Sequence, residues 1–165
     1  MFTVTTSTSG TPADAQAVRT LYRELLDHWN ERGATLMASL FLEDGNVVGF
    51  DGSQLDGRAA IESELGRIFR DHATGAYFGI VREVRFLTSD VAILRAVAGM
   101  VPARQSDLNP ALNTVQTLVA IRHGGRFRIA VYQNTPAALH GRPDLVQAMT
   151  DELRQAQRAS PATAP

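Results

Sequence analysis

Two titratable side chains in this sequence could move a proton on a bound molecule. Asp51 precedes Gly52, so it is most simply a turn residue, but it could also place a carboxylate at the rim of a pocket. His72 follows a helical pattern and carries an imidazole that titrates near neutral pH. General acid–base chemistry needs such a group beside the substrate, and we therefore predict Asp51 and His72 as the catalytic candidates.

A second set of side chains could orient a ligand. Gln116 alternates with Leu118 and Ala120, and Gln133 follows Val131 and Ile129. A buried polar group needs a partner, so each such residue either bonds within the protein or faces a ligand. The predicted orienting residues are Tyr22, Asn113, Gln116, Gln133 and Asn134. Trp29 shares a helical stripe with Tyr22, and the two aromatic rings either fill the core or line a cavity beside it.

Several classes of chemistry are excluded by what the sequence lacks. Without cysteine it can have no disulfide, thiolate nucleophile or Cys-based metal site. Without lysine, all 16 basic residues being Arg, it cannot form a Schiff base. The four histidines are not paired at ligand spacing, and no glycine-rich phosphate loop or nucleophile elbow occurs. We predict no metal site and no cofactor.

The elements that must position these residues are helices first and strands afterwards. Apolar periodicity predicts helices at residues 12–32, 34–41, 56–70 and 141–158, with Thr11 and Asp56 as N-caps. A short strand is expected at 47–50, between an Asp44-Gly45 turn and an Asp51-Gly52 turn. Longer strands are expected at 77–88, 91–101, 113–123 and 126–134. This order predicts an α+β fold with helices packed on one face of an antiparallel sheet.

Length and composition predict one domain, residues 13–158, between a flexible leader at 1–12 and a flexible tail at 159–165. A net charge of −1 gives no reason to expect nucleic acid or an anionic membrane as a partner. No apolar run approaches the roughly 20 residues of a membrane span, and the first residues do not resemble a signal peptide. We expect a cytoplasmic protein.

Two of the strands lack a plainly polar face. In residues 91–101 and 113–123 both alternating sets of side chains are largely apolar, whereas a sheet with one side in water alternates apolar and polar residues. Both sides of the sheet should therefore be covered. We predict a homodimer through the outer face of the sheet; the alternative is that the final helix folds back over that face.

Five segments together resemble the nuclear transport factor 2-like superfamily, and within it the SgcJ/EcaC group found in enediyne antibiotic gene clusters of actinobacteria. They are Trp29-Asn30, Phe41 with Asp44, Phe50-Asp51-Gly52, Gly57-Arg58 with Ile61, and Tyr132-Gln133-Asn134-Thr135-Pro136. The resemblance runs from Ala13 to Leu153 and implies a cone-shaped α+β barrel around a cavity. It also implies a role in handling a hydrophobic polyketide intermediate. Because scytalone dehydratase in this superfamily uses pocket histidines and tyrosines, the resemblance draws attention to His72 and Tyr77.

Three functions remain open at this stage. A cofactor-free isomerase, cyclase or dehydratase would place a titratable group in the cavity. A non-catalytic binder or carrier, protecting a reactive intermediate, would not need one. A purely structural dimerising module would have no room for a ligand. The first two share the prediction of a hydrophobic small molecule as partner.

Overall fold

A computed structural model describes residues 10–160 of the chain. Residues 1–9 and 161–165, which hold most of the predicted leader and tail, lie outside the described residues. The helices are α1 (Pro12–Asn30), α2 (Ala34–Ser39), α3 (Arg58–Asp71) and α4 (Pro143–Ala159), with a short 3-10 turn, η1, at Pro110–Leu112. The strands are β1 (Phe41–Val48), β2 (Gln54–Asp56), β3 (Ala76–Thr88), β4 (Val91–Val101), β5 (Thr114–His123) and β6 (Arg126–Pro136).

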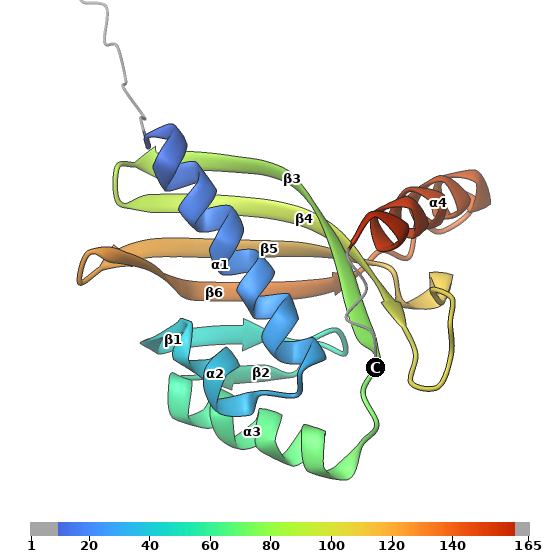
Figure 1. The fold of residues 1–165 in the computed structure, drawn as a ribbon, viewed down its shortest axis with the longest axis horizontal. Coiled ribbons are helices and arrows are strands. Elements are labelled where there is room, and N and C mark those ends of the chain that lie inside the picture. The colour runs from blue at the N-terminus through green and yellow to red at the C-terminus, as the bar shows by residue number, and fades with distance from the viewer. Residues whose placement is uncertain (1–9, 161–165) are drawn as a thin grey trace, which may run out of the picture.

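The six strands form one curved sheet in the order β2-β1-β6-β5-β4-β3 (Figure 1). All neighbours are antiparallel except β1 and β6, which run parallel. Helix α1 crosses one face of the sheet, while α2 and α3 lie beside the β1–β2 edge (Figure 1). The α+β fold predicted from the sequence is confirmed, and its curvature leaves a hollow between the sheet and the first three helices.

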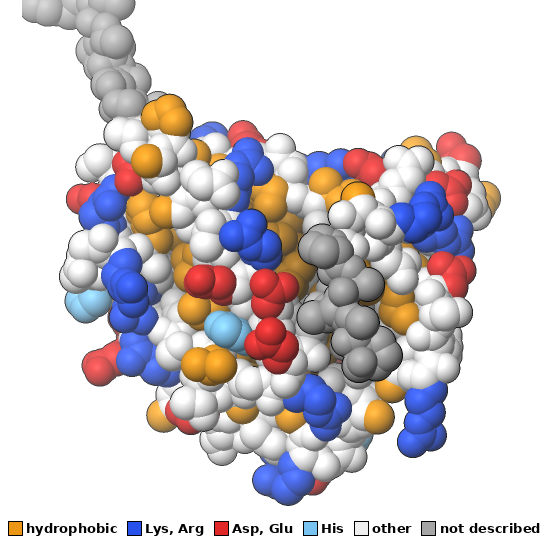
Figure 2. Space-filling model, viewed as in Figure 1, with side chains coloured by type: hydrophobic (Ala, Val, Ile, Leu, Met, Phe, Trp, Pro, Cys, Tyr) orange, Lys and Arg blue, Asp and Glu red, His pale blue; other side chains and the backbone are white. Residues whose placement is uncertain are grey.

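Helix α1 begins where the sequence predicts. The Thr11 side chain accepts a hydrogen bond from the backbone N–H of Asp14, and the Asp14 carboxylate accepts one from the N–H of Thr11, which completes a capping box. The buried stripe of α1 packs on the inner face of the sheet, against Leu94, Leu118 and other strand residues. On the outside of this helical face, charged side chains of both signs are scattered among uncharged ones (Figure 2).

The opposite, outer face of the sheet is covered at one end by α4. Leu153 is fully buried there with Val97, Val101 and Leu108 in a second core cluster. Arg82 on β3 pairs with Glu152 on α4, with Nη1 and Oε1 2.5 Å apart. The rest of the outer face is not covered by the described residues, and Val115 on β5 is 42% exposed. Thus the final helix does fold onto this face, but only over part of it.

Two local predictions were wrong. Asp44-Gly45 is not a turn but lies inside β1, where a register shift between Phe41 and Asn46 accommodates the two residues. The N-cap of α3 is Gly57, at φ +90°, rather than Asp56, which ends β2. Asp51-Gly52 does form the turn of the β1–β2 hairpin, as expected.

Candidate functional site

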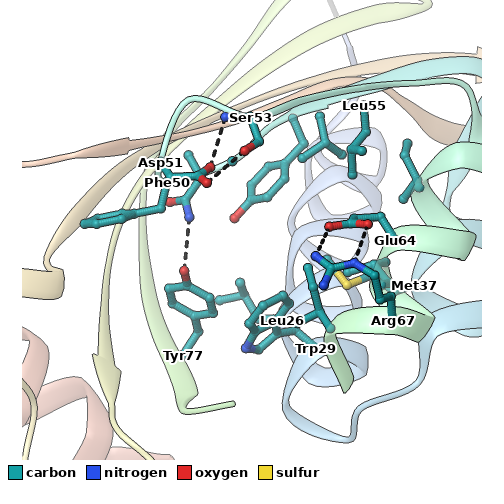
Figure 3. Close-up of a pocket in the computed structure, with 17 residues that line it drawn as sticks. Leu26, Trp29, Met37, Phe50, Asp51, Ser53, Leu55, Glu64, Arg67 and Tyr77 are labelled. Atoms are coloured by element: carbon teal, nitrogen blue, oxygen red, sulfur yellow. Dashed lines mark hydrogen bonds and ion pairs between the residues drawn. The ribbon is translucent and has the colours of Figure 1, made fainter. Parts of the chain in front are cut away.

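A cavity of about 400 Å³ fills the hollow between α1, α3, the β1–β2 hairpin and the inner face of β3 and β6. Most of its wall is apolar. The aliphatic and thioether side chains that line it are Leu26, Met37, Val47, Leu55, Ile61, Leu65 and Ile68. Aromatic side chains of Trp29 and Phe50 complete this wall (Figure 3). A volume of this size matches the smaller ligand pockets of proteins, and its lining favours a hydrophobic molecule.

The inner polar wall of the cavity consists of Tyr77, Tyr132 and Asn134. Asn134 is 7% exposed, and its Nδ2 donates a hydrogen bond to the Tyr77 hydroxyl at 3.0 Å. The Tyr132 hydroxyl has no hydrogen-bond partner among residues 10–160. Burial raises the pKa of both phenols, and the neighbouring phenols of Tyr22 and Tyr77 raise that of Tyr132 further. Both tyrosines are therefore neutral hydrogen-bond donors at physiological pH.

Behind this wall lies a second layer of buried polar groups. Gln116 is fully buried; its Nε2 donates to Asn134 Oδ1 at 3.2 Å, and its Oε1 accepts from the Tyr22 hydroxyl at 2.6 Å. Thr114 also donates to Asn134 Oδ1. Burial, with Tyr77 as a smaller contribution, strongly raises the pKa of Tyr22. These residues hold Asn134 and Tyr77 in place without lining the cavity themselves.

Charged groups are confined to the mouth of the cavity. On the hairpin loop, Asp51 accepts hydrogen bonds from the Ser53 backbone N–H at 2.9 Å and hydroxyl at 2.8 Å, which lower the pKa of its carboxyl. On α3, Glu64 pairs with Arg67, and the hydrogen bonds between them lower the pKa of Glu64 (Figure 3). Both carboxylates are thus stabilised as anions and are weak bases.

Trp29 closes the side of the cavity next to α1. Its Nε1 donates to the Gly75 carbonyl at 3.0 Å, and its ring packs against Phe69 and Tyr77 with centroids 5.2 and 5.5 Å away. It is the only tryptophan in the sequence. All tryptophan fluorescence of the protein therefore comes from this side of the cavity.

The structure brings four of the predicted site residues to the cavity: Trp29, Tyr77 and Asn134 in its wall, and Asp51 at its mouth. Tyr22 and Gln116 lie in the layer behind it. His72 is placed elsewhere: it is exposed at the C-terminal end of α3, where its backbone carbonyl accepts a hydrogen bond from Arg32. Asn113 is also distant, because its Nδ2 donates to Thr150 of α4 at 2.9 Å.

Gln133 points away from the cavity, and the reason is a bulge in β6. Val119 pairs with Val131 while Ala120 pairs with Ile129, so Ala130 is an extra residue and the alternation of side chains changes phase. Ile129 is fully buried on the inner face, whereas Gln133 is exposed on the outer face opposite Thr117. A strict two-residue alternation, as assumed from the sequence, therefore fails at this strand.

Sequence reasoning missed Tyr132, Ser53 and the Glu64–Arg67 pair. Tyr132 and Asn134 are two residues apart on one strand, and this spacing is the signal that could have assigned Tyr132 to the same face as Asn134. The Glu64–Arg67 spacing of three residues is an ordinary surface pair on a helix, so nothing in the sequence marked it as part of a site.

Within residues 10–160 no cluster of three or more histidine or carboxylate side chains is placed to hold a metal ion. No helix in this part of the chain is long and apolar enough to cross a membrane. Chemically, the site can enclose an apolar molecule and donate neutral hydrogen bonds from tyrosines. Its carboxylates stand at the entrance.

No family model and no curated protein sequence matches the chain. Solved structures with the same fold are numerous. A domain of unknown function with a cystatin-like fold from Nostoc punctiforme superposes with a TM-score of 0.74 at 23% identity, covering 90% of this chain and 94% of that one. A nuclear transport factor 2-like protein from Shewanella oneidensis gives 0.62 at 14% identity, covering 76% and 99%.

A protein from Novosphingobium aromaticivorans assigned as a scytalone dehydratase also gives a TM-score of 0.62, at 15% identity, covering 76% of this chain and 85% of that one. These likenesses establish the fold: the chain has the α+β cone of the cystatin-like and nuclear transport factor 2-like proteins. At such identities they carry no information about substrate, and function must be argued from the cavity.

Proposed function

We propose that this protein binds a hydrophobic small molecule in its cavity and serves as a carrier or protective binder for it. The observation that carries the proposal is the contrast within the cavity: a wall of aliphatic and aromatic side chains, with only neutral polar groups inside. Burial of apolar ligand surface supplies the affinity, and the few polar groups set orientation. The resemblance to the SgcJ/EcaC group suggests a polyketide intermediate of enediyne antibiotic biosynthesis in the actinobacterial cytoplasm as the ligand.

A cofactor-free isomerisation, cyclisation or dehydration is the second candidate. The observation that favours it is the pair of tyrosines, because neutral phenols can stabilise negative charge that develops on a substrate oxygen. Such a reaction also needs a base. Asp51 is the candidate carboxylate at the mouth, but its hydrogen bonds to Ser53 lower its pKa and with it its basicity. For this reason we rank binding above catalysis.

We further propose that two copies associate through the part of the outer sheet face that α4 leaves uncovered. Ile93, Val119 and Val131 lie opposite one another on three adjacent strands there, and Val115 is 42% exposed. A contiguous apolar surface of this kind favours association. The cavity opens on the other side of the sheet, so association would leave it accessible.

The binding proposal is tested with cis-parinaric acid, a conjugated tetraene whose absorption overlaps tryptophan emission. Binding beside Trp29 should quench its fluorescence saturably and produce tetraene emission. Ile68→Arg places a charge in the cavity wall and should abolish this transfer. Leu87→Arg, at a 46% exposed site on β3 outside the cavity, is the matched control and should leave it unchanged. Equal loss in both variants, or no saturable quenching in the unmodified protein, would contradict the proposal.

A further inference from the structure

Two of the three tyrosines of the chain, Tyr22 and Tyr77, are connected by a relay of side-chain hydrogen bonds that passes through Gln116 and Asn134. Tyr22, the first residue of the relay, fixes the donor-to-acceptor direction of its hydrogen bonds. Tyr22 is only 3% exposed, so its hydroxyl hydrogen must be donated within the protein. Gln116 Oε1 is the only acceptor of that hydrogen among the described residues, and the 2.6 Å separation is typical of an O–H donor rather than an N–H donor.

The donor and acceptor roles of the following groups in the relay are then fixed in turn. With its oxygen turned toward Tyr22, Gln116 presents Nε2 to Asn134 Oδ1 at 3.2 Å. Thr114 donates to the same oxygen. Asn134 must therefore present Nδ2 to Tyr77, whose hydroxyl oxygen accepts it at 3.0 Å. Each amide in the relay has one orientation that satisfies its neighbours, and this orientation is set by the buried phenol at the far end.

The orientation of the relay determines which hydrogen-bonding groups face the cavity. The Tyr77 oxygen accepts from Asn134, and its hydrogen has no acceptor among residues 10–160; the same holds for the hydrogen of Tyr132. Asn134 Oδ1 accepts a hydrogen bond from Gln116 Nε2 and lies within hydrogen-bond distance of the Thr114 hydroxyl, whose single hydrogen can also be donated to the Thr135 carbonyl. The inner polar wall thus offers two hydroxyl donors, and among the described residues the Tyr132 hydroxyl oxygen is its one acceptor that receives no hydrogen bond.

We propose that the cavity selects ligands with an acceptor oxygen, a ketone, aldehyde or enolate, placed against Tyr77 and Tyr132. Tyr22, Gln116 and Asn134 are positioning residues, which keep the Tyr77 hydrogen directed at the ligand. The inference rests on the proposed small-molecule function and adds the chemical class of the ligand. The raised pKa values of the three phenols are consistent with it, because all three stay protonated at neutral pH.

Specificity follows from the cost of leaving a buried donor unpaired. A hydrocarbon of the same shape would fill the cavity but remove the tyrosine hydroxyls from water without giving them an acceptor. The difference in affinity between ketone and hydrocarbon should be about tenfold, as expected for one or two neutral hydrogen bonds. An alcohol can accept as well as donate, so it should fall between the two.

The experiment compares β-ionone with the hydrocarbon in which a methylene group replaces its ketone oxygen, and with the alcohol β-ionol, by isothermal titration calorimetry. Infrared spectroscopy of bound β-ionone gives a second readout, since a hydrogen-bonded carbonyl absorbs at lower frequency than a free one. We expect preference in the order ketone, alcohol, hydrocarbon, with a lowered carbonyl frequency.

Variants distinguish the residue that contacts the ligand, Tyr77, from a residue that positions it, Gln116. Tyr77→Phe should lower ketone affinity, leave hydrocarbon affinity unchanged and reverse part of the infrared shift. Gln116→Met keeps the length of the side chain and removes its hydrogen bonds in the relay. Although residue 116 does not contact the ligand, this variant should reduce the infrared shift of the bound carbonyl. Gln133→Met, on the exposed outer face, is the matched control and should change nothing. Thermal unfolding confirms that each variant is folded, and Gln116→Glu provides a second relay variant if Gln116→Met is not.

The outcomes distinguish the two proposals. Equal affinity for ketone and hydrocarbon, or an unshifted carbonyl, would overturn the acceptor-oxygen inference while leaving the hydrophobic cavity intact. Preference for the alcohol over the ketone would show that the relay runs the other way and would also overturn it. If none of the three molecules binds, both the inference and the proposed binding function are wrong.

Discussion

Replacement of Gly79 by alanine should destabilise the protein through one identifiable contact. A Cβ atom at Gly79 of β3 would lie well inside van der Waals distance of the Tyr22 hydroxyl and 2.8 Å from Leu26 Cδ1. The hydroxyl cannot retreat freely, because it is hydrogen-bonded to the fully buried Gln116 at 2.6 Å. Overpacking of this kind costs about 1–3 kcal/mol of unfolding free energy.

A double-mutant cycle with Tyr22→Phe tests this reasoning. Removal of the hydroxyl relieves the nearest clash but leaves Leu26, so Gly79→Ala should cost about 1 kcal/mol less in the Tyr22→Phe background than in the unmodified protein. Urea unfolding measures the free energies, and thermal unfolding should show shifts of about 2–4 °C per kcal/mol. Equal cost of Gly79→Ala in both backgrounds would refute the placement of the Tyr22 hydroxyl against β3.

Three further predictions address other parts of the structure. Leu153→Ala, at a fully buried site between α4 and the sheet, should lower the unfolding free energy by about 2–5 kcal/mol in urea titrations; a negligible loss would mean that α4 is not docked. Ser53→Ala should raise the pKa of Asp51 toward its ordinary value in a carbon-13 NMR titration. Because the folded pKa of Asp51 is depressed, its contribution to stability is present above the unfolded pKa and is lost as the pH falls through the folded value, so Ser53→Ala should reduce stability near neutral pH and have less effect in acid. Val119→Arg should convert dimers to monomers on size-exclusion chromatography while Leu36→Arg, on a 55% exposed helical site, should not; an unchanged elution volume for Val119→Arg would exclude this part of the face.

The long elements of the fold could be predicted because their sequence signals are local. The strand Val91–Val101 matches the predicted bounds, and Thr11 caps α1 through its own side chain. Asp44-Gly45 misled because an Asp-Gly pair signals a turn, whereas the parallel pairing of β1 with β6 absorbs it as an irregularity. That pairing joins segments more than 80 residues apart, and no local pattern reveals it.

The site was harder to predict because it depends on register. Gln116 and Gln133 look alike in sequence, each a glutamine among apolar residues. The bulge at Ala130 sends them to opposite faces of the sheet, so that Gln116 joins the relay and Gln133 is exposed. Tyr132 and Asn134, two residues apart after the bulge, share the inner face. Only the paired strands establish this arrangement.

The proposal that a hydrophobic molecule binds inside the cavity is tested most directly by locating such a molecule on the protein. Isotope-filtered nuclear Overhauser measurements on methyl-labelled protein with unlabelled β-ionone would identify the methyl groups that contact it. We predict contacts to Leu65 and Ile68 of α3, inside the cavity. Contacts confined to Val115 and Val119 on the outer face of the sheet would contradict it, because the ligand would then occupy the proposed dimer surface instead of the cavity.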